Sequence, residues 1–340
     1  MSSRFSYLSF ALDSVLYGPS YGLMNQLARI SVPLDPDVVW DVINRQYSPA
    51  IEWFRTRYPP AAARRILLRG RMRQSHATGI SHHYDVSNDF YRIMLDKKYM
   101  FYSCADFLRE DETLEEAQTN KANAILELLQ PRAGENILEL GSGWGSMLKV
   151  ISNQTGDPAH LHGYTLSQAQ FEHNQATHQF NIQLKNFITA DYPVGRFDAI
   201  YSIGAWEHVR PDEIQPLLRK LHQALVPGGR MVKHFFCLPT DNLPVSMLAT
   251  QLCFPGSQLV SHHFHVRAFE QAGFRIVRQT VSDYRPTVRA WFNNLVANKT
   301  EAIEAGGVLN YNRYLVFTAA WYRFFNDGEA NLYRFQLVKR

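Results

Sequence analysis

The sequence predicts an α/β protein built on a doubly wound, mostly parallel sheet and preceded by a helical extension. Short apolar runs alternate with helical stretches from about residue 136 to 236, as in parallel sheets. The run 137–140 breaks into glycines and then into a helical pattern, which is typical of a buried strand turning into a helix. Polar residues follow the strands, at the edge where such sheets bind ligands. They are Gly141, Thr165, Asp191, Glu207 and His234.

Composition places the chain among ordinary globular proteins. Its 340 residues are 46% hydrophobic and 19% charged, with a net charge of +4. The three cysteines are Cys104, Cys237 and Cys253. An odd number without metal-type pairing favours a reducing, cytoplasmic compartment. No apolar run approaches the ~20 residues of a membrane helix, and the apolar stretch 5–12 is too short for a signal peptide.

Residues 1–75 form a predicted helical N-terminal extension, in which prolines punctuate amphipathic stretches. Residues 55–73, called the arginine-rich segment below, contain seven arginines and no acidic residue. Two interpretations remain open: peripheral contact with an anionic membrane or an acidic substrate, centred on Arg64–Arg73, or a solvated helix face. Nucleic acid is disfavoured, because no recognition motif accompanies the charge.

Residues 81–107 are dense in aromatic side chains and histidines and show little periodicity. Such a composition suits a lid or a binding segment better than a core element. A clear helix follows from Thr113 to Leu129, and Thr113 and Glu116 form a capping box at its start.

The glycine loop after the first strand indicates which cofactor is bound. A dinucleotide fingerprint would place its third glycine at position 146, which is Ser146. Here the glycines are Gly141, Gly143 and Gly145, and Glu139 precedes them. Glycine permits the sharp turn and the close approach of a ligand. The pattern E-x-G-x-G-x-G resembles motif I of class I, Rossmann-like, S-adenosylmethionine-dependent methyltransferases, so we expect S-adenosylmethionine rather than a nicotinamide cofactor.

The rest of the sheet follows in order. We expect strands at 160–167, 184–190, 197–203 and 230–236, with a helix at 212–225 and a turn at 227–229. Residues 238–272 break the alternation and are interpreted as a substrate-side insertion. Its cluster His262, His263 and His265 raises a metal hypothesis, but no cysteine or acidic partner at metal-like spacing supports one. A strand at 274–282, helices to Phe325 and an antiparallel last strand at 332–338 complete residues 76–340.

Six motifs within residues 76–340 resemble the cyclopropane-fatty-acyl-phospholipid synthase and mycolic acid cyclopropane synthase family, and coclaurine-type N-methyltransferases share most of them. The motifs are Ser81–Asp85, Tyr102–Ala105, Gly141–Gly145, Thr165–Gln170, Ser202–His208 and Tyr284–Thr287.

The resemblance implies methyl(ene) transfer to an unsaturated lipid or fatty acyl chain through a carbocation that bound bicarbonate deprotonates. The bicarbonate would be held by the backbone at Cys104, by the carbonyl of Phe236 and by three side chains, Glu207, His234 and Tyr284. Two structural alternatives remain: Glu207 could cap the helix after it, and His234 could be a satisfied histidine at a strand end.

The resemblance also implies a set of cofactor-binding residues. Thr165 and Gln170 would contact the methionine portion and the ribose, and Asp191 would accept from the adenine amine. Tyr84 would belong to the lid or to the core. The full set is Tyr84, Tyr102, Ser103, Glu139, Gly141, Gly143, Thr165, Gln170 and Asp191.

Departures from the family pattern leave a second enzyme class open. Ser142 replaces the usual Cys, and Phe236 replaces an aliphatic residue. Residues 234–237 and 326–329 look closer to the N-methyltransferase branch, whereas Cys104 is typical of the synthases. The alternative is an N- or C-methyltransferase of a small hydrophobic metabolite. A non-enzymatic scaffold would have lost Glu207, His234 or Tyr284, and all three are present.

Overall fold

The computed structural model describes residues 6–17, 19–55, 87–241 and 259–340, and the chain divides into two compact units. We call them the helical unit and the sheet unit. The helical unit contains the described residues up to Leu95 and the segment Arg285–Glu329. The sheet unit contains Asp96–Asp241, residues 259–284 and Ala330–Arg340. The chain therefore leaves the sheet unit after Tyr284 and returns to it at Ala330.

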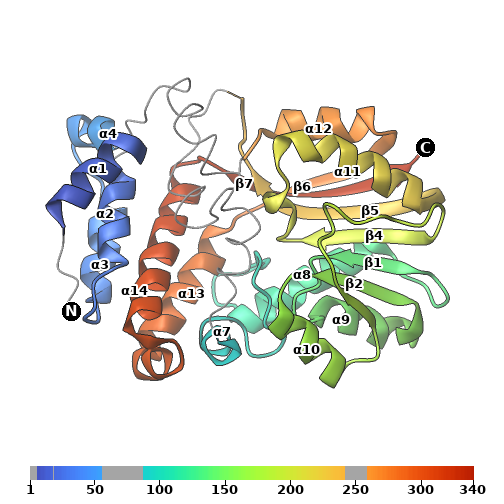
Figure 1. Ribbon diagram of the computed structural model, residues 1–340, viewed down its shortest axis with the longest axis horizontal. Helices are drawn as coiled ribbons and strands as arrows, with labels where there is room; N and C mark the ends of the chain where they lie inside the picture. The colour runs from blue at the N-terminus through green and yellow to red at the C-terminus, as the bar shows by residue number, and fades with distance from the viewer. Residues whose placement is uncertain (1–5, 18, 56–86, 242–258) are drawn as a thin grey trace. The chain divides into compact units, whose positions relative to one another are not determined.

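The sheet unit is built on a seven-stranded sheet in the order β3-β2-β1-β4-β5-β7-β6. The first five strands in the chain pair in parallel, and β7 is antiparallel to both of its neighbours. The arrangement, seen in Figure 1, confirms the predicted doubly wound sheet. The strands are β1 (Ile137–Leu140), β2 (Leu161–Thr165), β3 (Asn181–Leu184), β4 (Phe197–Ile203), β5 (Leu225–Cys237), β6 (Phe274–Ser282) and β7 (Asn331–Lys339).

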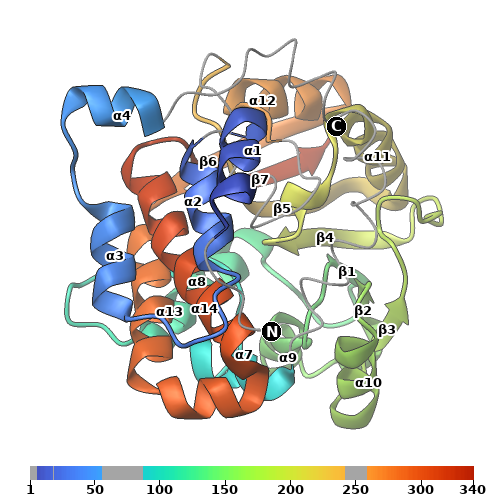
Figure 2. The same cartoon turned by 60° about the vertical axis from the view of Figure 1, so that its left-hand side comes forward.

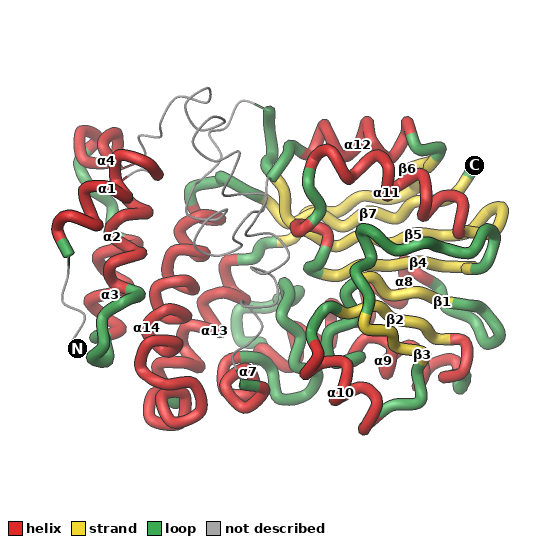
Figure 3. The backbone as a smooth tube through the Cα atoms, viewed as in Figure 1, coloured by secondary structure: helices red, strands yellow, loops and turns green. Residues whose placement is uncertain are grey.

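Helices cover both faces of this sheet, as the tube in Figure 3 shows. One face carries α8 (Leu114–Leu129), α9 (Ser146–Thr155) and α10 (Gln168–Thr177), and the other carries α11 (Pro211–Ala224) and α12 (His262–Gln271). The predicted capping box of Thr113 and Glu116 begins α8. Two short 3₁₀ turns, η1 (Pro158–His160) and η2 (Trp206–His208), precede β2 and follow β4. Each face of the sheet therefore has its own apolar core.

The chain order places a ligand site at the carboxyl ends of β1 and β4. From β1 the chain proceeds outward through β2 to β3, and it then crosses back to β4 on the other side of β1. In open α/β sheets, ligands bind outside the carboxyl ends of the strands at such a point. The glycine loop follows β1, and Glu207 follows β4.

The structure corrects two predictions about secondary structure. The strand expected at 184–190 is β3, which ends at Leu184. Asn186 stops it, because its side chain accepts from the backbone N–H of Ile188 at 2.9 Å and folds the chain into a turn. The described part of the expected insertion, residues 259–272, contains α12. Phe269 of this helix packs into the core beneath β6, so α12 is a regular covering helix of the sheet.

The helical unit is a separate helix assembly in which α3 and α14 lie side by side, as Figure 2 shows. Asn312 of α14 donates to the carbonyl of Ile30 at 2.8 Å and accepts from the N–H of Leu34 at 2.9 Å. Among the described residues, no helix has both the length and the apolarity needed to cross a bilayer. Beyond Arg55, the arginine-rich segment lies outside the described residues. The helices are α1 (Tyr7–Tyr17), α2 (Pro19–Leu27), α3 (Pro36–Asn44), α4 (Pro49–Arg55), α7 (Asn88–Met94), α13 (Arg285–Ala297) and α14 (Lys299–Asn326).

Part of the expected lid is a core helix of the helical unit. Phe90, Tyr91 and Met94 of α7 are buried. The Tyr91 hydroxyl lies 2.6 Å from that of Tyr314. A buried hydroxyl pair of this kind satisfies both polar groups. The aromatic residues that suggested a lid at 88–94 therefore serve packing.

Candidate active site

The glycine loop after β1 combines one glycine required by packing with one that leaves open space. Both have positive φ, 80° at Gly141 and 54° at Gly143. A Cβ on Gly141 would lie 2.5 Å from the Cβ of Ala205, whereas a Cβ on Gly143 would meet no atom of the described residues within 4 Å. We expected both glycines to permit a sharp turn and the close approach of a ligand. Ligand approach fits Gly143, while Gly141 is needed for the loop to pack against Ala205, which follows β4.

Hydrogen bonds from β2 and α10 fix the position of this loop. The N–H groups of Gly141 and Ser142 both donate to the carbonyl of Tyr164, at 3.0 and 2.9 Å. Asn174 of α10 donates to the carbonyl of Gly143 at 2.8 Å. Sequence reasoning missed Asn174, although it lies one helical turn after Gln170 and therefore on the same face.

Thr165 and Gln170 meet at the end of β2. The Thr165 hydroxyl donates to Oε1 of Gln170 at 2.9 Å, and both residues are buried. Two of the predicted cofactor residues are thus joined directly, beside the glycine loop.

Glu139 of β1 is a carboxyl group in an apolar environment. It is 4% exposed, and its Oε2 has no hydrogen-bond partner among the described residues. Burial raises the pKa of Glu139 to about 8, although the nearby phenol of Tyr201 and the Lys121 amine oppose this shift. Buried polar atoms without a partner are uncommon in proteins, and those that occur are concentrated at functional sites.

The segment Tyr102–Cys104 is held against the ends of β4 and β6. Its fit over β4 is tight, because a Cβ on Gly204 would come within 3.2 Å of the Ser103 Cβ. The Ser103 hydroxyl accepts from the buried amine of Lys121 at 3.0 Å. The Cys104 thiol lies 3.6 Å from the carbonyl oxygen of Asp283, just before Tyr284. Tyr84 lies outside the described residues.

Glu207 lies in η2 and is turned toward β5. Its Oε1 accepts from the backbone N–H of Phe236 at 3.1 Å, and its Oε2 has no partner among the described residues. The N-cap of α11 is Arg210, so Glu207 is not the cap of the helix that follows it. Burial raises the pKa of Glu207 to about 7, which leaves its carboxyl able to hold a proton near neutral pH.

His234 of β5 is fully buried and has one occupied ring nitrogen. Arg334 Nε lies 3.2 Å from Nδ1, while Nε2 has no partner among the described residues. Burial, reinforced by the charges of Arg334 and Lys121, holds the pKa of His234 well below its usual range, so the ring is neutral.

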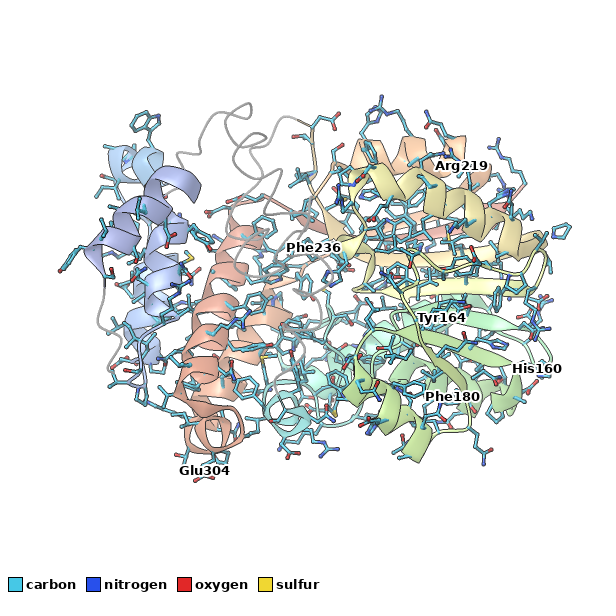
Figure 4. The ribbon with its side chains drawn as sticks, in the orientation of Figure 1. His160, Tyr164, Phe180, Arg219, Phe236 and Glu304 are labelled. Atoms are coloured by element: carbon cyan, nitrogen blue, oxygen red, sulfur yellow. The ribbon has the colours of Figure 1, made fainter. Side chains whose placement is uncertain are left out.

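Contacts bring Cys104, Glu207 and Tyr284 together at one edge of the sheet, and His234 lies on the strand that carries Phe236. The labelled Phe236 in Figure 4 marks the carboxyl end of β5, two residues after His234. Its N–H contacts Glu207, and its ring lies 6.5 Å from that of Tyr284, centroid to centroid. Cys104 joins through Asp283. Residues from four separate parts of the chain thus meet at this edge of the sheet.

Asp191 is not joined to this group. It follows the turn after β3 with a fully exposed side chain, whose Oδ1 lies 3.9 Å from the Lys220 amine. Its assignment to the adenine amine therefore stays a prediction.

Comparison with known proteins shows the family. The model for mycolic acid cyclopropane synthetase matches residues 71–335. The chain belongs to the mycolic acid cyclopropane synthetase family. Its relatives include an S-adenosylmethionine-dependent methyltransferase and several cyclopropane mycolic acid synthases, and this chain is an S-adenosylmethionine-dependent methyltransferase as well.

Three similar proteins illustrate the relationship. The methyltransferase UmaA of Mycobacterium tuberculosis is 31% identical over 279 residues, which cover 75% of this chain and 95% of UmaA. The structure of the mycolic acid cyclopropane synthase CmaA1 with SAH and CTAB has a TM-score of 0.70 at 28% identity, covering 78% of this chain and 98% of CmaA1. Coclaurine N-methyltransferase bound to N-methylheliamine and SAH has a TM-score of 0.72, covers 94% of this chain and 99% of its own, and is only 21% identical, so it shows the fold alone.

This member of the cyclopropane synthetase family has a second buried polar cluster, which sequence reasoning missed, on the α12 side of the sheet. The fully buried amine of Lys233 lies 3.6 Å from the ring centroid of Trp206. Burial keeps the pKa of Lys233 well below its usual range, although the nearby charge of Glu207 opposes the shift. Glu207, Trp206 and His265 also line one small pocket. Glu207 thus belongs both to this cluster and to the predicted site.

The three histidines of α12 contact different groups. His262 lies 2.9 Å from the amide oxygen of Gln279. His265 stacks edge-on against Phe235, with the ring centroids 4.6 Å apart, and burial lowers its pKa to about 3. His263 is exposed. Within the described residues no group of His, Cys, Asp and Glu side chains is arranged to hold a metal ion.

Proposed function

We propose that the chain transfers a methylene group from S-adenosylmethionine to the double bond of an unsaturated acyl chain, in the manner of a cyclopropane synthase. Bound bicarbonate would serve as the base. Family membership and the printed names of the relatives support the reaction class. The observation that carries the proposal is a pair of buried atoms that have no partner among the described residues, Glu207 Oε2 after β4 and His234 Nε2 near the carboxyl end of β5.

The residues beside β1 fit the cofactor. S-adenosylmethionine supplies an electrophilic methyl group when bound. The open space at Gly143 admits the ligand's close approach, and the unpartnered Glu139 Oε2 offers it a polar partner. Thr165, Gln170, Tyr102 and Ser103 would complete the contacts, together with Tyr84 and Asp191.

The residues around His234 fit an anion. Bicarbonate supplies an oxygen that accepts a proton. Neutral His234 can donate from Nε2, and Glu207 can donate from Oε2 when it carries a proton, since its pKa is about 7. The Cys104 backbone, the Phe236 carbonyl and the Tyr284 hydroxyl would supply the remaining contacts. Such preorganised polar groups inside a dry site stabilise charge more strongly than water-exposed groups do.

The aromatic surroundings suit a reaction that passes through a cation. Methyl transfer to an alkene leaves a carbocation, and loss of a proton closes the three-membered ring. The rings of Phe236 and Tyr284 lie 6.5 Å apart, and aromatic faces stabilise nearby cations. An amine methyltransferase also forms a cation, an ammonium, so these rings favour neither acceptor. The bicarbonate requirement separates them, because an ammonium proton is lost without a special base.

The decisive experiment measures turnover in degassed, bicarbonate-depleted buffer, before and after bicarbonate is restored. Mass spectrometry of lipid and small-metabolite pools identifies which pool gains one CH₂ group. Restored bicarbonate should restore turnover on the lipid pool. Glu207→Gln and His234→Gln should each lower kcat by ~10²- to 10⁴-fold with SAH affinity nearly unchanged, and added bicarbonate should partly rescue Glu207→Gln.

The matched control is His160→Gln. His160 precedes β2 at the edge opposite the site, as its label in Figure 4 shows, and it pairs with Asp157. This variant should keep full turnover. Turnover of an amine acceptor that does not respond to bicarbonate would defeat the cyclopropanation proposal and establish the alternative, a methyltransferase of a small hydrophobic metabolite.

A further inference from the structure

Arg334 of β7 connects His234 to the partly buried carboxylate of Asp106. Residues 234 and 334 are paired directly across the antiparallel strands β5 and β7, so their side chains lie on the same face of the sheet. Arg334 Nε lies 3.2 Å from Nδ1 of His234, and Arg334 Nη2 lies 3.0 Å from Asp106. The Arg334 and Asp106 side chains are 6% and 12% exposed. The three groups therefore form a buried chain, Asp106–Arg334–His234.

The chemistry of the guanidinium determines where the imidazole carries its proton. A guanidinium has five N–H donors and no acceptor, so Nδ1 of His234 must accept. A neutral imidazole has one N–H, and it must then lie on Nε2. Asp106 prevents Arg334 from turning away, and the hydroxyl of Ser282, 3.2 Å from Asp106 Oδ1, supports the carboxylate in turn.

We propose that Arg334, anchored by Asp106, is a positioning residue that fixes His234 in the Nε2–H tautomer, so that this ring donates a hydrogen bond to an anion in the site. The functional part of this inference rests on the proposed bicarbonate site. The tautomer itself follows from the contacts of Arg334 alone.

As a consequence, Nε2 of His234 always presents an N–H donor to the site. That atom is buried and has no partner among the described residues. A buried N–H is costly when nothing accepts from it. An Nδ1–H tautomer would instead present the lone pair of Nε2, which repels an anion. Arg334 thus determines whether the ring attracts or repels the proposed base.

The first test is the tautomer in the wild-type protein. The ¹⁵N spectrum of protein labelled at its histidines should show a pyrrole-type Nε2 and a pyridine-type Nδ1 for His234, assigned by loss of the signals in His234→Gln. This measurement needs neither substrate nor cofactor. A pyrrole-type Nδ1 would overturn the inference, whatever the reaction is.

The second test removes the donor. Arg334→Met keeps the length of the side chain and removes its charge and its N–H groups. The variant should lose the single tautomer, and the bicarbonate concentration for half-maximal turnover should rise about tenfold or more, as expected for loss of a charge-assisted hydrogen bond. SAH affinity should stay within about twofold of wild type, because the contacts of Arg334 involve none of the predicted cofactor residues. Arg334→Lys, which keeps the charge but not the fork geometry, should recover part of the loss.

Arg230→Met is the matched control. Arg230 lies on β5, as His234 does, and its guanidinium pairs with the carboxylate of Glu135 at 2.6 Å. Removing it should leave the His234 spectrum and the bicarbonate requirement unchanged. The positioning role is overturned if Arg334→Met loses the single tautomer while the bicarbonate concentration for half-maximal turnover stays at the wild-type value. If wild-type His234 has the predicted tautomer but turnover does not depend on bicarbonate, the proposed function is refuted and the tautomer assignment stands.

Discussion

Replacing Glu139 with Gln should stabilise the ligand-free protein while weakening cofactor binding. The carboxyl group is buried, and burial raises its pKa to about 8, against 4.5 for an ordinary Glu. The folded protein therefore binds this proton more tightly than the unfolded chain does. Between those two values, rising pH favours the unfolded chain, so stability is lost as the pH rises from 4.5 toward 8 and then stays at its lower level.

The size of the effect follows from the two pKa values. Each pKa unit of difference is worth 1.36 kcal/mol. Relative to pH 4, the free energy of unfolding of wild type therefore falls by roughly 3 kcal/mol at pH 7 and by about 5 kcal/mol above pH 8. Gln has nearly the same shape and no titration, so Glu139→Gln avoids this loss. The two proteins should have equal stability near pH 4, and their free energies of unfolding should diverge as the pH rises.

Urea unfolding at several pH values measures the divergence. With a slope near ~3 kcal/mol per molar urea, the midpoint of Glu139→Gln should exceed that of wild type by about 1 M at pH 7. Glu127→Gln is the control, because Glu127 pairs with Arg278 while its side chain is 66% exposed. It should show no pH-dependent gain. A Glu139→Gln midpoint at or below wild type, with a gap that does not grow with pH, would refute the reasoning.

Three further predictions concern the cofactor loop and the extension. Gly143→Val should abolish SAH binding in calorimetry, because its side chain would fill the open space at a φ of 54° that strains a β-branched residue; unchanged SAH affinity would show that the ligand does not approach here. Asn174→Ala should weaken SAH binding by about 1 kcal/mol, since the Gly143 carbonyl loses its donor, and a change in stability alone would make Asn174 purely structural. Replacing the five arginines between 64 and 73 with Gln should weaken sedimentation with anionic vesicles by ~1 kcal/mol per residue that meets the surface, in a salt-dependent way. Equal sedimentation with neutral and anionic vesicles would favour the interpretation that these arginines lie on a solvated helix face.

Local patterns predicted most of the sheet unit. The run 137–140 is a fully buried strand, and the capping box at Thr113 begins α8. These features depend on neighbouring residues, so periodicity and capping chemistry reveal them. The prediction that β3 extends to Ala190 was wrong, because one side-chain hydrogen bond from Asn186 outweighed a weak apolar pattern.

Sequence patterns could not predict which ionisable side chains are buried. Lys121 and Lys233 occupy positions where a lysine would normally face water, and both are fully buried. Arg334 contacts His234 across 100 residues of sequence. That pairing exists only because β7 inserts beside β5 in one register, and register follows from the assembled sheet. The motif residues could be predicted, but the residues that orient them could not.

The position of β7 between β5 and β6 constrains how the chain is made. Synthesis produces β5, then β6, then α13 and α14 of the other unit, and only afterwards the strand that joins the first two. Until it emerges, β5 has one unpaired edge and β6 has no strand partner at all, and open strand edges invite pairing between chains. His234 also lacks its guanidinium partner during this interval. A nascent chain halted before residue 331 would therefore combine an incomplete predicted site with open strand edges, and chaperone protection is most valuable at this stage.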